Sequence, residues 1–239
     1  MAEIHIHNLH KSFKKNHVLK GIDLKIEDGG IYSILGPNAS GKTTLIKTLL
    51  GMVIPDGGQI DINGKNILDQ WMYKDQISYL PQLANFPENL TTKELFTMIQ
   101  ELRGKKGNVN ILVDEFGLSS HLEIKLSNLS GGTKQKVNLV LALMYDNPIY
   151  IFDEPTAGLD PVALITFKKM LFLLKKRGCI VIITTHIISF VEDMSDEIIF
   201  LLEGEIRFFG KVKKLNRAFN STSLETSIAL LLQDNSVSS

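Results

Sequence analysis

Cysteine, net charge and long apolar runs are all scarce in this sequence of 239 residues. The single cysteine, Cys179, excludes a framework of intramolecular disulfides and is typical of a reducing compartment. Lysine plus arginine and aspartate plus glutamate each total 26, so the bulk charge points neither to nucleic acid nor to anionic lipid. No apolar run reaches the roughly 18 residues of a spanning helix, and the chain opens on no basic segment followed by an apolar one. We therefore expect a soluble chain that binds no nucleic acid and reaches a membrane only through a partner.

What the sequence does contain is an alternation of short apolar runs with amphipathic segments, which predicts an α/β fold. Four runs are apolar almost throughout, as in strands buried on both faces of a mostly parallel sheet. These are residues 31–35, 149–152, 180–183 and 198–201. Residues 3–7 and 21–26 instead alternate apolar with polar, which predicts an antiparallel N-terminal β-subdomain with one face in water. Asn63-Gly64 predicts a hairpin turn in it.

Strand patterns stop between residues 82 and 130, where 92–103 and 109–116 have helical periodicity. A further helix is predicted from Asp160, its N-cap, to the residue before Gly178. The predicted organisation is a core of residues 1–81 and 131–210, an inserted helical subdomain of residues 82–130, and a short helical tail of residues 211–239.

A glycine-rich turn joins the apolar run at 31–35 to a helical stretch at 44–50. Its residues are Gly36, Pro37, Asn38, Ala39, Ser40, Gly41, Lys42 and Thr43, followed by Thr44. In this context the spacing is that of a phosphate loop, whose backbone N–H groups surround phosphates. Lys42 would reach the β and γ oxygens of a nucleotide and Thr43 would bind Mg²⁺. A turn that holds a lysine and a threonine by chance is the alternative, which the flanking strand and helix disfavour.

Two further patterns point to nucleotide chemistry. The apolar run at 149–152 ends in Asp153 and Glu154, where the first carboxylate would hold the Mg²⁺ shell and the second would orient or deprotonate a water. An exposed acidic strand end is the alternative. Ser130 begins a second helix with free N–H groups, which predicts either a serine cap or an anion site completed by another subunit.

Taken together, six motifs in this order resemble the ATP-binding subunits of ABC transporters over nearly the whole chain. They are the loop at 36–43, Leu80-Pro81-Gln82, the segment 129–135, Asp153-Glu154, Gly158-Leu159-Asp160 and Thr184-Thr185-His186. The resemblance implies an ATPase that uses ATP and Mg²⁺ and dimerises with a second ATPase subunit, most simply as a homodimer. It also implies transmembrane permease partners and a peripheral position on the cytoplasmic face of a bacterial inner membrane.

The resemblance assigns roles within one subunit to three residues. Phe13 would stack on adenine, with packing in the core as the alternative. Gln82 would contact Mg²⁺ and the lytic water, and His186 would contact the γ-phosphate. With Lys42 and Glu154 these two form the implied catalytic set.

Between subunits, the resemblance implies that Ser130, Gly131 and Gly132 bind the γ-phosphate held by the opposite copy. Asp160 would lie in the loop that links the two sites. Three residues depart from the family's pattern. Ala39 replaces a glycine, Thr133 a glutamine and Phe13 a tyrosine. The alanine is expected to be tolerated if its φ is negative.

Two surface features are open to more than one interpretation. Leu83, Phe86 and Leu90 follow Gln82 and are candidates to dock a cytoplasmic helix of the membrane partner, or to pack within the helical subdomain. Four histidines, at positions 5, 7, 10 and 17, suggest a metal site, since His5 and His7 share a strand face. We favour an exposed edge strand instead, because no cysteine or methionine cluster accompanies them.

The type of transporter is predicted from two observations. The chain ends 53 residues after His186, which leaves no room for a large regulatory domain and favours an exporter-type system. Residues 79–91 and 131–136 resemble the NosF-like branch, which implies copper-site maturation of nitrous oxide reductase and a periplasmic copper-handling partner. A non-transport mechanochemical or signalling ATPase, and a nucleotide-binding module without turnover, are the competing hypotheses.

Overall fold

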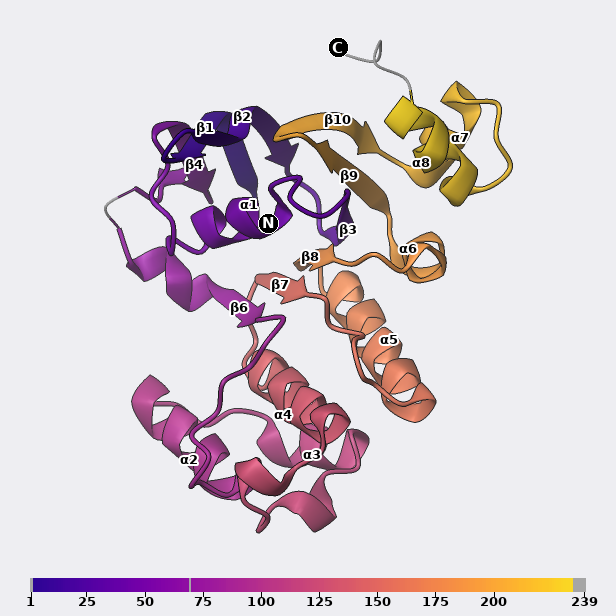
Figure 1. Ribbon diagram of the computed structural model, residues 1–239. Helices are drawn as coiled ribbons and strands as arrows, with labels where there is room; N and C mark the ends of the chain where they lie inside the picture. The colour runs from indigo at the N-terminus through magenta and orange to yellow at the C-terminus, as the bar shows by residue number, and fades with distance from the viewer. Residues whose placement is uncertain (1, 69, 234–239) are drawn as a thin grey trace.

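The computed structural model describes residues 2–68 and 70–233, which form two sheets covered by helices (Figure 1). Within these residues the larger sheet is mostly parallel, and only the pair β10 and β9 is antiparallel. Its strands in spatial order are β10 (Glu205–Gly210), β9 (Glu197–Leu202), β3 (Gly30–Leu35), β8 (Ile180–Thr184), β7 (Ile149–Asp153) and β6 (Ile77–Leu80). All four apolar runs lie in this sheet, so the predicted α/β class is confirmed.

Alternate residues of each central strand pack into two different apolar cores. In β7, Ile149 and Ile151 join the core that contains α1 (Lys42–Leu49) and the antiparallel sheet. Tyr150 and Phe152 face the other way, into the core formed with the helices numbered 2 to 5. Because both faces are covered, both sets of residues are apolar, which explains the near-continuous hydrophobic runs.

The smaller sheet is antiparallel and packs on the first of these cores. Its strands in spatial order are β2 (Asn16–Ile26), β1 (Ile4–Phe13), β4 (Gly57–Ile62) and β5 (Lys65–Asn66). Asn63 and Gly64 form the predicted turn, with φ of 53° and 70° as a two-residue hairpin requires. The expectation of an edge strand for the first histidines was wrong, because β1 lies between β2 and β4. Local alternation shows which face of a strand is wet but not where the strand sits in the sheet.

In Figure 1 the helices after α1 lie at the bottom (α2 to α4), at the right (α5 and α6) and at the top right (α7 and α8). They are α2 (Thr92–Arg103), α3 (Val109–Glu115), α4 (Gly131–Leu143), α5 (Pro161–Lys176), α6 (Ile188–Met194), α7 (Val212–Ala218) and α8 (Leu224–Gln233), with short 3₁₀ turns at Met72–Gln76, Ser119–His121 and Leu126–Asn128. No helix of the described residues is long and apolar enough to span a bilayer.

Helices α2 and α3 occupy the segment 82–130 and lie at the bottom of Figure 1, far from the antiparallel sheet at its top left. The two tail helices, α7 and α8, pack with α6 and β9 through Leu215, Leu224 and Leu231. Residues 234–239 of the expected tail lie outside the described residues. This arrangement leaves the carboxyl ends of the central strands available for a site.

Candidate functional site

The carboxyl ends of β3, β7 and β8 bring together three segments that are far apart in the sequence. Asp153, the last residue of β7, pairs with Thr184, the last residue of β8, and the glycine-rich loop follows the neighbouring β3. A cavity of about 630 Å³ opens there. It is lined by Asn16, Val18, Gly36, Asn38, Ala39, Ser40, Gly41, Lys42, Thr43, Thr44, Gln82, Asp153, Glu154, Thr184 and His186.

The glycine-rich loop is shaped by close approach to the end of β9. A Cβ added to Gly36 would lie 2.0 Å from the Leu201 carbonyl oxygen, so only glycine fits at this position. The N–H of Gly204 donates to the Ser40 carbonyl at 3.1 Å and ties the loop to the turn after β9. Since α1 begins directly after Gly41, the first-turn N–H groups of this eight-residue helix offer positive partial charge to an anion.

Ala39 adopts a conformation that the sequence did not lead us to expect. Its φ is +64°, in the left-handed region, whereas the alanine was expected to be tolerated through a negative φ. The loop geometry imposed by its neighbours outweighs the steric preference of one Cβ, which costs roughly 1–2 kcal/mol. The departure from the usual glycine therefore stores strain in the loop.

Lys42 lies folded back onto its own loop. Its Nζ donates to the carbonyl oxygens of Gly36 at 2.7 Å and of Pro37 at 2.9 Å. Burial lowers the pKa of Lys42, and the nearby carboxylates of Glu154 and Asp153 act in the opposite direction. The ammonium group of Lys42 therefore lies in the cavity and donates to two backbone carbonyl oxygens. Phosphate oxygens could replace these carbonyl oxygens as acceptors at a small cost in free energy.

The two carboxylates after β7 are held in different environments. The Thr184 hydroxyl donates to Asp153, and the backbone N–H of Glu154 donates to the Thr184 carbonyl at 3.0 Å. The Glu154 side chain is only 13% exposed, and its Oε2 lies 3.0 Å from Nδ1 of His186. Its backbone has a φ of +49°, a conformation that costs free energy and turns the side chain into the cavity. The structure thus places a buried carboxylate, with a histidine beside it, in the same cavity as Lys42.

Two buried amides of α4 hold the loops that carry Gln82 and Glu154. Asn138 Nδ2 donates to the Pro81 carbonyl at 3.1 Å, and Gln135 Nε2 donates to the Pro155 carbonyl at 2.9 Å. Both side chains are less than a tenth exposed. A buried amide that lost either partner would leave an unsatisfied group, so these contacts fix the loop positions.

Comparison with known proteins now adds the identity of the family. The sequence model described as "ABC transporter" matches residues 19–157, more than half of the chain. This chain belongs to the ABC transporter family. It is an ATP-binding subunit and an ATPase. This ABC ATPase has the P-loop fold of the family.

Three relatives of this ABC ATPase illustrate the similarity. The ABC-type transporter ATP-binding protein EcsA of Bacillus subtilis (strain 168) is 31% identical over 225 residues, which cover 92% of this chain and 91% of EcsA. The L-cystine import ATP-binding protein TcyN of the same organism is 33% identical over 217 residues, 85% of this chain and 83% of TcyN. A solved ATP binding subunit of an ABC transporter superposes with a TM-score of 0.90 at 28% identity, covering 96% of this chain and 99% of that one.

Not every residue that the motifs singled out lies at the cavity of the ABC ATPase. Phe13 ends β1 at 48% exposure, outside the lining residues, with Lys11 Nζ 5.4 Å from the centre of its ring. Asn16 and Val18 of β2 line the cavity instead. Neither residue belongs to a motif, so no signal in the sequence could have identified them.

The turn that contains Ser130 and Gly132 also lies away from the lining of its own cavity. Ser130 caps α4 by accepting from the Thr133 N–H at 3.2 Å. A Cβ on Gly132 would lie 2.6 Å from the Gly158 carbonyl oxygen, so this turn packs directly on the loop before α5. Ser130 and Gly131, at the N-terminus of α4, are exposed and do not line the cavity of their own chain.

Asp160 has structural partners that the motif did not reveal. Its carboxylate accepts from the Ala163 N–H at 2.8 Å as the N-cap of α5 and lies 2.6 Å from Lys136 Nζ. Hydrogen bonding to Lys136 and to the helix N-terminus lowers the pKa of Asp160. Lys136 stands at the end of the segment 131–136, and only the tertiary structure shows what it contacts.

The candidate docking residues divide into two groups. Phe86 and Leu90 are partly buried and pack against the core of the helical segment, which favours the packing alternative for these two side chains. Leu83, by contrast, is 81% exposed in the loop that begins at Gln82. The spacing of apolar residues cannot distinguish these outcomes, because the carbonyl groups of Glu88 and Leu90 bond to Ser127 and Leu126, which lie more than 30 residues further along the chain.

Proposed function

We propose that this ABC ATPase cleaves ATP in the cavity described above, with Glu154 as the group that orients or deprotonates the attacking water. The observation that carries the proposal is the contact of 3.0 Å between Glu154 Oε2 and His186 Nδ1, in the cavity that Lys42 also lines. A buried carboxylate that lines the cavity is a group that general base catalysis can use. His186 lies beside that carboxylate and can donate a hydrogen bond toward a γ-phosphate.

The phosphates are held by the loop 36–43 and the N-terminus of α1. A Cβ at Gly36 or Gly41 would meet the carbonyl oxygens of Leu201 or Val18, so glycine lets the loop pack closely there while its backbone lines the cavity. Lys42 exchanges its carbonyl partners for the β and γ oxygens. Asp153, Thr43 and Gln82 supply the hard oxygen ligands that Mg²⁺ prefers, and they would hold the ion. Mg²⁺ bound there would neutralise charge on the phosphate oxygens.

The site is completed by a second copy of the chain. Ser130, Gly131 and Gly132 open α4 with unused N–H groups but do not line the cavity of their own protomer. Two protomers arranged head to tail, so that each of these turns faces the other's phosphate loop, would use this second anion site. Asp160 and the Gly132–Gly158 contact then connect one site to the other. Phe13, exposed at the end of β1, is proposed to stack on the adenine ring.

The work of closure is passed to transmembrane permease subunits, which place the chain at the cytoplasmic face of the membrane. We assign these subunits to an exporter-type or NosF-like system, with a periplasmic copper-handling protein as a further partner. The support is the resemblance of residues 79–91 and 131–136 described above. Copurification from solubilised membranes tests this assignment. A multi-span protein with a periplasmic copper protein is the expected result, and recovery of soluble partners alone would contradict it.

Substitution of Glu154 by glutamine tests the catalytic proposal. We expect the hydrolysis rate to fall by roughly 10²–10⁴-fold, because the amide cannot accept a proton, while ATP binding is retained. Glu101→Gln on the exposed face of α2 is the matched control and is expected to hydrolyse at the wild-type rate. A Glu154→Gln variant with wild-type turnover would exclude Glu154 from catalysis.

A further inference from the structure

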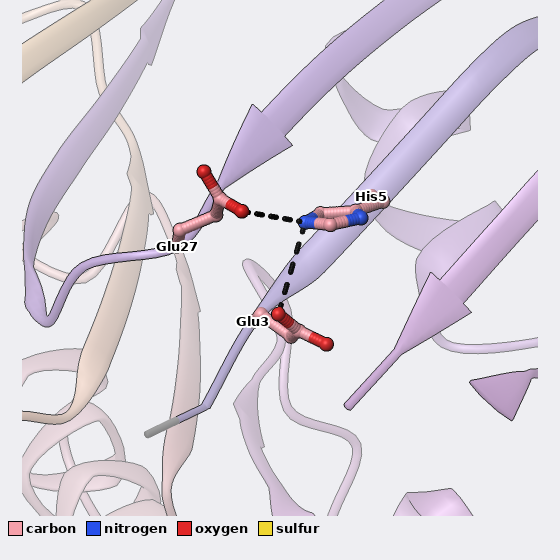
Figure 2. Close-up of side chains that lie close together, drawn as sticks. All are labelled: Glu3, His5 and Glu27. Carbon is pink, nitrogen blue, oxygen red and sulfur yellow. Dashed lines mark ion pairs between the residues drawn. The ribbon is translucent and has the colours of Figure 1, made fainter. Parts of the chain in front are cut away.

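A second group of chemically active side chains lies on the antiparallel sheet, where Glu3, His5 and Glu27 converge (Figure 2). Glu3 immediately precedes β1 and His5 is two positions further, so both point to the same face. His5 pairs with Lys25 of β2, and Glu27 follows two positions beyond Lys25. The two-residue period of adjacent strands therefore gathers one imidazole and two carboxylates on one face.

The backbone under this group is fixed on several sides. The N–H of Glu3 donates to Asn63 Oδ1 at 3.0 Å, and the N–H of Asn63 donates to the Glu3 carbonyl at 3.1 Å. His5 belongs to an interior strand and pairs with Asp61 of β4 as well as with β2. A site on such a backbone is largely preorganised, which favours the binding of an ion over rearrangement.

The distances within the group are too long for hydrogen bonds. His5 Nε2 lies 3.5 Å from Glu27 Oε1 and 3.9 Å from Glu3 Oε2, whereas an N–H···O bond is about 2.7–3.2 Å. Within the described part of the chain this nitrogen is shielded from solvent and makes no hydrogen bond. Two ligands that are each about 2.1 Å from an ion lie roughly 3–4 Å apart. The three ligand atoms all lie within 4.8 Å of one another, so small side-chain movements would bring them to the spacing that a bound ion requires.

We propose that Glu3, His5 and Glu27 bind one Zn²⁺ ion that links the start of β1 to the end of β2. An imidazole nitrogen with carboxylate oxygens is a donor set that Zn²⁺ accepts at these distances. Mg²⁺ and Ca²⁺ favour oxygen ligands throughout, and softer metals favour thiolates. Three protein ligands leave a fourth position for water.

Lys25 is the group that competes with the ion. Its Nζ lies 2.8 Å from Glu27 Oε1. One of the Glu27 oxygens therefore carries a partner that zinc must displace. Lys25 is 61% exposed and can move into solvent.

His7 provides an internal comparison on the same face of β1. It is 84% exposed and faces one carboxylate, that of Asp23, at 3.0 Å. His10 and His17 form another pair, with Nδ1 and Nε2 3.3 Å apart, and Asn8 as the further partner of His10. Neither arrangement offers three ligands of the kind found at His5.

The site also lies apart from the nucleotide cavity. None of Glu3, His5 and Glu27 lines the nucleotide cavity. Zinc binding is therefore expected without nucleotide and independently of the catalytic proposal.

Isothermal titration of the whole protein with ZnCl₂, in the presence of Mg²⁺ and the absence of nucleotide, tests the assignment. We expect one equivalent to bind and the unfolding temperature to rise. His5→Ala and the isosteric Glu27→Gln are each expected to weaken the affinity by at least about 10-fold, with unchanged circular dichroism. His7→Ala and His10→Ala are matched controls that should bind as the wild type does.

Lys25→Gln sharpens the test, because it removes the competing ammonium without touching a ligand. Tighter zinc binding by this variant is expected, and unchanged or weaker binding would overturn the three-ligand assignment. The proposal is also refuted if the wild-type protein binds no zinc, if His5→Ala and Glu27→Gln bind it equally well, or if affinity is lost in His7→Ala or His10→Ala.

Discussion

Replacement of Ala39 by glycine should stabilise this protein, although glycine substitutions usually destabilise. Ala39 has a φ of +64°, which costs an L-residue roughly 1–2 kcal/mol. Glycine removes that cost but gains about 0.4–1 kcal/mol of conformational freedom in the unfolded chain. The difference favours Ala39→Gly by about 0.5–1 kcal/mol. For a chain of this size that corresponds to a rise of about 1–4 °C in the unfolding temperature.

Equilibrium urea unfolding without nucleotide, compared with thermal unfolding, measures this difference. Ala229→Gly on the exposed face of α8 is the matched control, since glycine inside a helix costs about 1 kcal/mol. The two variants should therefore shift stability in opposite directions. If Ala39→Gly lowered stability as Ala229→Gly does, the phosphate loop would not store backbone strain and the reasoning would be refuted.

Three other substitutions probe contacts outside the catalytic residues. Gly132→Ala places a Cβ 2.6 Å from a backbone carbonyl oxygen, so it should cost about 1–3 kcal/mol and slow hydrolysis. Gly131→Ala has open space around it and should be at least as stable as the wild type; equal stabilities of the two variants would contradict this. Leu83→Asp should keep basal ATPase activity but no longer copurify with the membrane partner, and a Leu83→Asp protein that still copurifies would show that Leu83 is not part of the interface. Phe86→Asp should instead destabilise the fold, because Phe86 packs against the core. Asp160→Asn retains a cap but loses its ion pair. Because the pKa of Asp160 is lowered, the wild type should lose stability as the pH falls from about 5 to about 2, and unfolding measured over this range should show a smaller loss for Asp160→Asn; equal losses would contradict this.

Predictions from sequence succeeded where the determining interactions are local. A phosphate loop is a strand, a turn and a helix in direct succession, so residues 36–43 and their neighbours were enough to predict it. The backbone angle that they did not predict is the φ of Ala39. The φ of Ala39 depends on how the loop meets the turn after β9, which lies more than 160 residues further along the chain. The domain boundaries and the roles of the site residues stay predictions.

Pairing between distant strands accounts for what the sequence could not supply. The hydrophobic runs showed that β7 and β8 are buried. Only the register between these strands brings Thr184 into contact with both Asp153 and Glu154. Similarly, the alternation of apolar and polar residues in β1 predicted which face is in water. It did not reveal that Glu27, just after β2, faces His5.

The sequence by itself determined the α/β class, the buried strands and the phosphate loop, because hydrophobic period and turn chemistry act over a few residues. The tertiary structure alone decided which loops meet at the cavity, the interior position of β1 and the packing of Gly132 on Gly158. Those contacts join residues far apart in the chain, and their geometry follows from strand order and register, which no local pattern encodes.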